Sequence, residues 1–351
     1  MKIAIAMVQV PFISGGAEIL AQMLRAELKK RGHEADIVTI PFKWYPVDSL
    51  LDCMMAGRML DLTEINGEKI DMVIAMKFPA FYVKHDNKVI WLMHQHRQAY
   101  DLWETEFGDL DKLENGEWAR EIIIKHDTQY MMEAKAIYTI ANNTSNRLFK
   151  YNGIKSETLY HPPLNHEKLY CGEFKNYIFY PSRIDSIKRQ RILVEAARYI
   201  KTDVQFVLAG SGSKKEIEYI NDLIKTYKLE SKVHLVGFIS EEEKINYYSN
   251  CLGVYFGAYD EDYGYITLES FFSKKPVIVH KDAGGPLEFV VDEENGYIID
   301  TDPKILAQKI DYLVENKEEA KTMGEKGYIS LQKKNVNWDF VINKLLNNNL
   351  V

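Results

Sequence analysis

Short apolar runs alternate with helical patterns along the first half of the chain. Residues 2–10 form an apolar run typical of a buried strand, and in residues 18–31 the apolar side chains recur at helical spacing until Gly32. The pattern predicts further strands at 70–76, 89–93 and 136–141 and a surface helix within 109–132. Apolar runs of this length between helices predict a parallel sheet covered on both faces.

The same alternation begins again in the second half. Strands are predicted at 177–182, 204–210, 233–238, 252–258, 276–279 and 297–299, and helices at 189–200, 214–228 and about 266–273. Ser240, with Glu243 three residues later, forms a capping box that starts another helix. Helical patterns follow from Lys304 to the end of the sequence. Each half therefore has the βα alternation of a doubly wound α/β domain.

Two prolines after His161 break regular structure and mark a linker between the halves. The 351 residues also predict two domains, at about 150 residues each. We place the boundary between residues 1–162 and 163–335. In two such domains that face a cleft, ligands bind at the carboxyl ends of the strands.

The composition narrows the class of protein. The hydrophobic share is 46%, the charged share is 27%, and the mean hydropathy is −0.29, as in a soluble enzyme. A net charge of −7 argues against a nucleic-acid partner. Three separated cysteines predict neither a disulfide framework nor a zinc site. We find no signal peptide and no apolar run near the 18–20 residues of a spanning helix, so we expect a cytoplasmic protein.

The segment 260–269 follows a predicted buried strand and leads into a helix. Backbone N–H groups of Gly264 to Thr267 would then lie at a helix N-terminus, which attracts phosphate. Glu261 and Glu269 each carry a carboxylate that can accept two hydrogen bonds from neighbouring hydroxyls. An ordinary solvated acidic loop followed by a helix-dipole glutamate explains the same residues equally well.

Two cations follow the predicted strand at 177–182. Arg183 and Lys188 would lie at its carboxyl end, where they could neutralise a diphosphate. Taken alone, such a pair is more often surface charge. Gly210 and Gly212 follow the next strand and allow a ligand to approach the backbone closely, although many such turns contain glycines.

The first half offers weaker signals. Residues 14–18 form a glycine-containing turn between the first strand and helix, but without the G-x-G-x-x-G spacing of dinucleotide folds. His94 and His96 follow a predicted strand and are conceivable metal ligands. No third histidine or cysteine is close in sequence, so we predict no metal site.

In their order and spacing these segments resemble the family 4 glycosyltransferases, which are retaining enzymes of the GT-B fold. The resemblance covers almost the whole chain. The matching motifs are Gly-Gly-Ala-Glu at 15–18, a histidine after an N-terminal strand, Tyr-His-Pro-Pro at 160–163, residues 182–188, Gly-Ser-Gly at 210–212, residues 233–238, the glutamates at 261 and 269, Lys-Pro-Val at 275–277 and Gly-Gly-Pro-Leu-Glu at 284–288.

The resemblance implies a role for each matching residue. Arg183 and Lys188 would bind the donor diphosphate and stabilise the departing nucleotide, Glu269 would bind the ribose, and Glu261 the transferred sugar. His94 is the best match to the family's histidine near that sugar, with His96 as the fallback. The other donor-binding positions would be Gly15, Gly16, Gly210, Gly212, Gly237, Phe238, Gly264, Tyr265, Ile266 and Thr267.

The resemblance also implies an architecture and a reaction. Residues 336–351 would form a helix that crosses back onto the first, acceptor-binding domain, and residues 163–335 would bind the nucleotide sugar. The reaction would move a hexose or N-acetylhexosamine from a UDP- or GDP-sugar to a glycan or lipid-linked glycan, as in polysaccharide synthesis. It would require no metal or other cofactor.

Several alternatives stay open. A nucleotide-sugar epimerase, a sugar phosphorylase or a non-catalytic sugar-binding protein could share these features. Asp262 stands where the family usually has glycine, and it completes a D-x-D string. We do not interpret this string as a metal motif, because that interpretation leaves the second βα half unexplained. We expect the acceptor to bind loops around 41–62 and 94–109, whose aromatic residues Trp44, Tyr45, Tyr100 and Trp103 could stack on sugars or pack internally. Oligomeric state and contact with the inner face of a membrane are left open.

Overall fold

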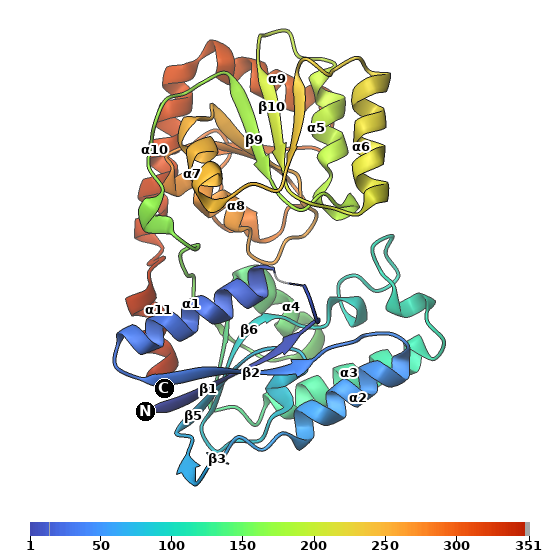
Figure 1. Ribbon diagram of the computed structural model, residues 1–351, viewed down its shortest axis with the longest axis vertical. Helices are drawn as coiled ribbons and strands as arrows, with labels where there is room; N and C mark the ends of the chain where they lie inside the picture. The colour runs from blue at the N-terminus through green and yellow to red at the C-terminus, as the bar shows by residue number, and fades with distance from the viewer. Residues whose placement is uncertain (14, 348–351) are drawn as a thin grey trace. The chain divides into compact units, whose positions relative to one another are not determined.

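The computed structural model describes residues 1–13 and 15–347 (Figure 1). The chain forms two compact units, one made of residues 1–164 with the segment from Asn337 onward, the other of Asn165–Val336. The two boundaries between these units lie two residues and one residue from the expected boundaries at 162 and 335. Ser14 and residues 348–351 lie outside the described residues.

The N-terminal unit is built on a six-stranded parallel sheet of order β2-β1-β5-β6-β7-β8. Its strands are β1 (Lys2–Gln9), β2 (Glu34–Pro41), β5 (Met72–Lys77), β6 (Lys88–His94), β7 (Ala136–Thr139) and β8 (Glu157–Thr158). A small antiparallel hairpin, β3 (Glu64–Ile65) and β4 (Glu68–Lys69), lies between β2 and β5 in sequence. Its helices are α1 (Gly16–Lys30), α2 (Val47–Met59), α3 (Gly116–Met131), α4 (Asn142–Asn152) and α11 (Trp338–Leu346).

The last helix belongs to the first unit. In that unit α11 packs against α1, and both are labelled there in Figure 1. The Trp338 ring lies 6.1 Å from the Trp91 ring and 5.9 Å from the His161 ring, measured between centroids. The Tyr138 hydroxyl donates to the Lys344 carbonyl at 3.1 Å. The expected return of the C-terminal helix to the first domain is confirmed.

The C-terminal unit has a second six-stranded parallel sheet, of order β11-β10-β9-β12-β13-β14. Its strands are β9 (Tyr177–Pro181), β10 (Gln205–Ala209), β11 (Val233–Gly237), β12 (Gly253–Phe256), β13 (Val277–His280) and β14 (Gly296–Ile299). Its helices are α5 (Gln190–Ala197), α6 (Lys214–Thr226), α7 (Glu241–Asn250), α8 (Tyr265–Phe272), α9 (Pro303–Glu315) and α10 (Lys317–Lys333). Helices α5 and α6 lie side by side in Figure 1, and α8 packs against α10.

Both units therefore have the predicted doubly wound α/β fold. The apolar runs form the buried strands: every residue of β12 and β13 is buried, as is β5 except for its last residue. The capping box is also present, because the Glu243 amide donates to the Ser240 hydroxyl at 3.2 Å and the Ser240 amide donates to the Glu243 carboxylate at 2.8 Å.

Candidate functional site

In the C-terminal unit the direction of chain progression reverses between β9 and β12. The chain runs from β9 to β10 and β11 on one side, then returns to place β12 and the following strands on the other. The loop after β9 contains Arg183 and Lys188, and the loop after β12 contains Glu261. In doubly wound sheets, ligands bind outside the strand carboxyl ends at such a switch point.

Lys188 and Glu261 point toward each other across this switch point. The Lys188 ammonium is hydrogen-bonded to the Glu261 carboxylate, and the two side chains are 16% and 27% exposed. The same ammonium lies 5.7 Å from the centroid of the Phe256 ring. At the backbone, the buried Tyr180 hydroxyl donates to the Lys188 carbonyl. A cation and a carboxylate are therefore held together at the place where a ligand is expected.

Arg183 is the more accessible of the two cations. Its side chain is 65% exposed, and Nη2 lies 3.1 Å from Asp185 Oδ2. The surrounding loop is fixed, because the Gln190 side chain donates to the Arg183 carbonyl at 2.8 Å and Asp185 accepts from the Ile187 amide at 3.1 Å. The guanidinium is thus available to an anion from solvent, while its backbone is held in place.

Gly210 and Gly212 let the loop after β10 lie against the loop that contains Arg183. A Cβ at Gly210, whose φ is 145°, would be 2.1 Å from the Ser182 carbonyl oxygen. A Cβ at Gly212 would be 2.4 Å from the Ile184 carbonyl oxygen. Both glycines are therefore explained by the close approach of two protein loops, whether or not a ligand also contacts them.

Gly237 and Phe238 lie at the carboxyl end of β11, the edge strand. Gly237 has a φ of 72°, and its carbonyl accepts a hydrogen bond from the Gly210 amide at 2.7 Å. The Phe238 ring is 84% exposed. An exposed ring beside this loop offers a flat apolar surface to a planar ligand group.

Helix α8 begins immediately after Gly264. Gly264 has a φ of 85°, and a Cβ there would be 2.7 Å from Pro286 Cγ, so glycine is required on both conformational and steric grounds. Tyr265, Ile266 and Thr267 form the first turn of the helix, and the Thr267 amide donates to the Gly264 carbonyl at 3.0 Å. The Thr267 side chain is buried, and its hydroxyl has no hydrogen-bond partner within the described part of the chain.

Glu269 lies one turn further along α8 and is 7% exposed. Its carboxylate accepts from the Lys244 ammonium at 3.0 Å and from the Tyr248 hydroxyl at 2.7 Å. Burial lowers the pKa of Lys244, but Glu269 and Glu241 offset this and raise it overall. Burial and the adjacent Glu269 raise the pKa of Tyr248. The carboxylate therefore has a fixed orientation that the sequence did not indicate, since only the fold places α7 beside α8.

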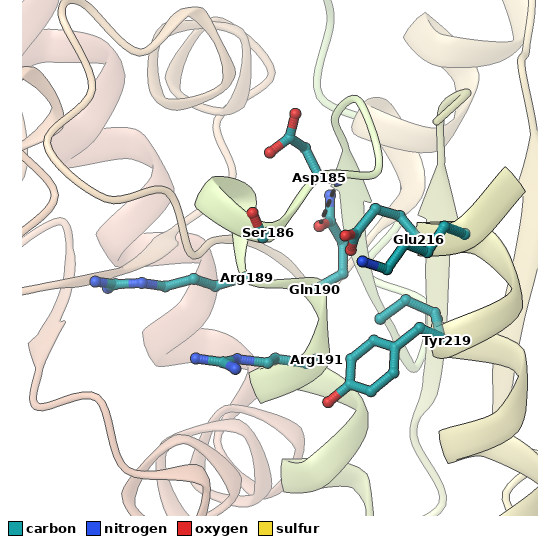
Figure 2. A pocket seen from close by; sticks show the side chains of 9 residues that line it. Asp185, Ser186, Arg189, Gln190, Arg191, Glu216 and Tyr219 are labelled. Carbon is teal, nitrogen blue, oxygen red and sulfur yellow. Dashed lines mark hydrogen bonds between the residues drawn. The ribbon is translucent and has the colours of Figure 1, made fainter. Parts of the chain in front are cut away.

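A pocket of about 250 Å³ lies next to the Arg183 loop, between the starts of α5 and α6. It is lined by Asp185, Ser186, Arg189, Gln190, Arg191, Lys215, Glu216, Tyr219 and Ile220. In Figure 2 the Arg189 and Arg191 side chains extend away from Glu216 and Tyr219. None of Arg183, Lys188 and Glu261 lines this pocket, so it is separate from the pair at the switch point.

In the N-terminal unit, His94 and His96 have different surroundings. His94 ends β6, is half-buried, and its Nδ1 lies 2.6 Å from the Gln95 carbonyl oxygen. His96 is buried between Phe78, with ring centroids 5.3 Å apart, and Phe42, at 6.1 Å. Burial, with smaller contributions from His94 and Lys77, lowers the pKa of His96 to about 3. His96 is therefore a neutral packing residue, which leaves His94 as the histidine able to reach a ligand.

The glycine turn before α1 is capped from within the chain. Gly15 precedes the helix, and Gly16 is its first residue. The Gly15 amide donates to the Glu18 carboxylate at 2.8 Å. Ser14, the first residue of this turn, lies outside the described residues. The Glu18 carboxylate thus accepts from the amide of Gly15, one of the two glycines that the resemblance assigns to donor binding.

Of the two segments expected to form acceptor loops, 41–62 is largely helical. Within 41–62, α2 occupies Val47–Met59. Tyr100 is buried, with its hydroxyl donating to Asp127 at 2.6 Å, so it packs internally. The Trp44 indole donates to Asp109 at 2.9 Å, and Arg120 lies 4.8 Å from the centroid of the half-buried Trp103 ring. The Tyr45 side chain is 51% exposed and remains accessible.

Residues 164–330, almost the whole C-terminal unit, match the family described as glycosyl transferases group 1. The C-terminal unit is thus similar to the glycosyl transferases group 1. Among the described residues of the chain, no three His, Cys, Asp or Glu side chains are grouped to hold a metal ion. None of its helices, within the same residues, has both the length and the apolar character required to cross a bilayer.

Individual proteins show the same relationship. Alpha-1,3/1,6-mannosyltransferase ALG2 of Dictyostelium discoideum is 32% identical over 133 residues, covering 36% of this chain and 31% of its own. An uncharacterized glycosyltransferase of Methanocaldococcus jannaschii is 32% identical over 188 residues, or 53% of this chain and 49% of its own. The matches thus span a third to a half of these curated relatives.

The fold is shared over the full length. The structure of sucrose-phosphate synthase from Thermosynechococcus elongatus aligns with a TM-score of 0.79 at 17% identity, covering 99% of this chain and 98% of that one. The chain therefore has the GT-B fold.

Proposed function

We propose that this protein is a retaining glycosyltransferase. It moves a hexose or N-acetylhexosamine from a UDP- or GDP-sugar to a glycan or lipid-linked glycan, in polysaccharide or glycoconjugate synthesis. The observation that carries the proposal is the ion pair of Lys188 with Glu261, which joins the loops after β9 and β12 in a unit that matches the group 1 family. Arg183 lies in the same loop as Lys188. The name of the ALG2 relative supports hexosyl transfer.

In the proposed site, Arg183 and Lys188 bind the donor diphosphate. Arg183 offers a planar fork of donors and Lys188 a compact charge. The first-turn amides of α8 contribute further donors to phosphate or sugar. Glu269 accepts hydrogen bonds from the ribose hydroxyls, and Glu261 from those of the transferred sugar.

The chemistry follows from where charge develops. As the bond to the sugar breaks, negative charge grows on the departing phosphate oxygen, and two fixed cations stabilise it without a metal. The acceptor hydroxyl attacks from the side that the nucleotide leaves. The departing oxygen takes the acceptor proton, so no covalent intermediate on the protein is needed.

The test is turnover of UDP- and GDP-sugars by purified protein, with and without a chelator. We expect transfer to a saccharide acceptor in the presence of the chelator. Arg183→Ala and Lys188→Ala should each lower turnover by about 100- to 1,000-fold, as for a lost oxyanion-hole donor. Arg191→Ala is the matched control, because it removes a nearby arginine with no proposed donor contact. Equal activity of all three variants would refute the assignment, and conversion of the donor without an acceptor would indicate an epimerase.

A further inference from the structure

Arg189, the residue after Lys188, has an unusual backbone conformation. Its φ and ψ are 54° and 38°, in the left-handed region where the Cβ of an L residue is crowded by the backbone. Glycine adopts this conformation without that cost. This conformation is less favourable for arginine than for glycine, and contacts of the side chain can offset the difference.

The Arg189 guanidinium makes such contacts with two residues from other loops. Nη1 and Nη2 donate to the two carboxylate oxygens of Asp282 at 2.9 and 2.8 Å, a bidentate arrangement. The guanidinium carbon also lies 5.0 Å from the centroid of the Tyr259 ring. The Arg189 and Asp282 side chains are 11% and 38% exposed, so the guanidinium is shielded while the carboxylate is partly open to solvent.

Both partners are connected to the segment that contains Glu261. The Tyr259 amide donates to the Ile187 carbonyl at 3.0 Å, which ties the loop after β12 to the turn before Lys188. The Asp282 carbonyl accepts from the Asp260 amide at 2.8 Å. The side chain of Arg189 thus joins the turn of Lys188 to Tyr259 directly and, through Asp282, to the Asp260 backbone.

We propose that Arg189 and Asp282 are positioning residues, which hold the Lys188 ammonium at the place where charge develops on the departing phosphate. The inference rests on the proposed function. Without the Arg189–Asp282 ion pair, the short turn 186–189 loses a bidentate contact to the loop after β13. Among the described residues, no other bidentate contact joins this turn to the loops after β12 and β13. Small misplacements of a group that acts in the transition state reduce turnover more than substrate affinity.

Arg189→Gly provides the decisive test because it removes the side chain and relieves the backbone at once. We expect kcat to fall about 10- to 100-fold, with a smaller change in the donor KM and no loss of the folded circular-dichroism spectrum. Arg189→Lys should recover part of the kcat, since an ammonium keeps the charge but not the fork. Asp282→Asn keeps the shape of the partner and should also lower kcat.

The matched control is Lys228→Gly. Lys228 also has a positive φ, 55°, in the same unit, and it lies in the turn after α6. This variant should keep the wild-type kcat. Wild-type kcat in both Arg189→Gly and Asp282→Asn would overturn the inference, and so would losses that appear only in KM. If Arg189→Gly fails to fold, Asp282→Asn alone decides. An inactive wild-type protein would instead contradict the proposed function.

Discussion

Lys188 and Glu261, 73 positions apart in the sequence, are joined by an ion pair between the loops that follow two adjacent strands. In the proposed reaction both contact the donor, Lys188 at the diphosphate and Glu261 at the sugar. An incoming diphosphate therefore competes with the Glu261 carboxylate for the same ammonium or shares it. The pair also keeps the cation correctly placed before the donor arrives.

Replacing Glu261 by Gln should strengthen nucleotide binding but slow turnover. Without the carboxylate, the Lys188 charge is free for the diphosphate, and we expect UDP or GDP alone to bind about fivefold more tightly, on the scale of about 1 kcal/mol for two charges about 4 Å apart in bulk water. Transfer should become slower, because a contact to the sugar is lost. Calorimetric titration with the nucleotide and a turnover assay measure the two effects.

Glu325→Gln is the control for this experiment, since it removes the carboxylate that pairs with Lys274 at 2.8 Å in the same unit. It should leave both quantities unchanged. Unaltered or weaker nucleotide binding by Glu261→Gln would show that the ion pair does not compete with the diphosphate.

The Tyr248 hydroxyl should affect recognition of the ribose through Glu269. Tyr248→Phe removes one of the two groups that orient the buried carboxylate. We expect affinity for UDP or GDP to fall about three- to tenfold, on the scale of one ordinary hydrogen bond, and the preference over the 2′-deoxy nucleotide to shrink. Tyr247→Phe is the neighbouring control. If both variants bind both nucleotides like wild type, Tyr248 has no role in recognition.

The sequence predicted most of the fold because most strands are buried on both faces. Continuous apolar runs mark β5, β6, β12 and β13 without ambiguity. It did not predict β2, whose mixed pattern of exposed and buried positions belongs to an edge strand. It also missed α2, where buried and exposed positions do not separate into clear faces.

The candidate site was predictable to a similar extent. Arg183, Lys188 and Glu261 could be found because they follow strands directly, and parallel strands bring their carboxyl ends to one edge. Arg189 and Asp282 could not, because their pairing depends on two loops 93 positions apart in sequence. The burial of His96 was equally inaccessible, since it depends on aromatic side chains from two other segments.

The two histidines should therefore behave differently on substitution. His96→Phe replaces one planar ring by another among Phe42 and Phe78, and we expect turnover within about twofold of wild type. His94→Ala should lower turnover about 10- to 100-fold if His94 contributes a hydrogen bond to the transferred sugar. Steady-state kinetics with the same donor compares them. The opposite ranking would assign the functional role to His96.

Buried titratable groups should make the N-terminal unit sensitive to pH. Burial lowers the pKa of His96 and of His161 to about 3, from an ordinary value of 6.5. Below pH 6.5 the unfolded chain takes up protons that the folded chain does not, so each histidine reduces the free energy of unfolding by up to about 1.4 kcal/mol per pH unit. Asp127 acts in the opposite direction. Burial raises the pKa of Asp127, hydrogen bonds from two tyrosines lower it, and the resulting pKa is about 7.

Between about pH 4 and 6.5, acidification lowers the free energy of unfolding through two histidines and raises it through one carboxyl group. The histidines outweigh the carboxyl group, so acidification should destabilise the unit. His96→Phe leaves one histidine against one carboxyl, so its stability should depend much less on pH over this range. All five tryptophans lie in the N-terminal unit, so their fluorescence during urea unfolding reports on that unit alone. Surface groups titrate equally in both proteins and cancel in the comparison. Parallel stability profiles for wild type and His96→Phe would mean that His96 titrates normally in the folded state.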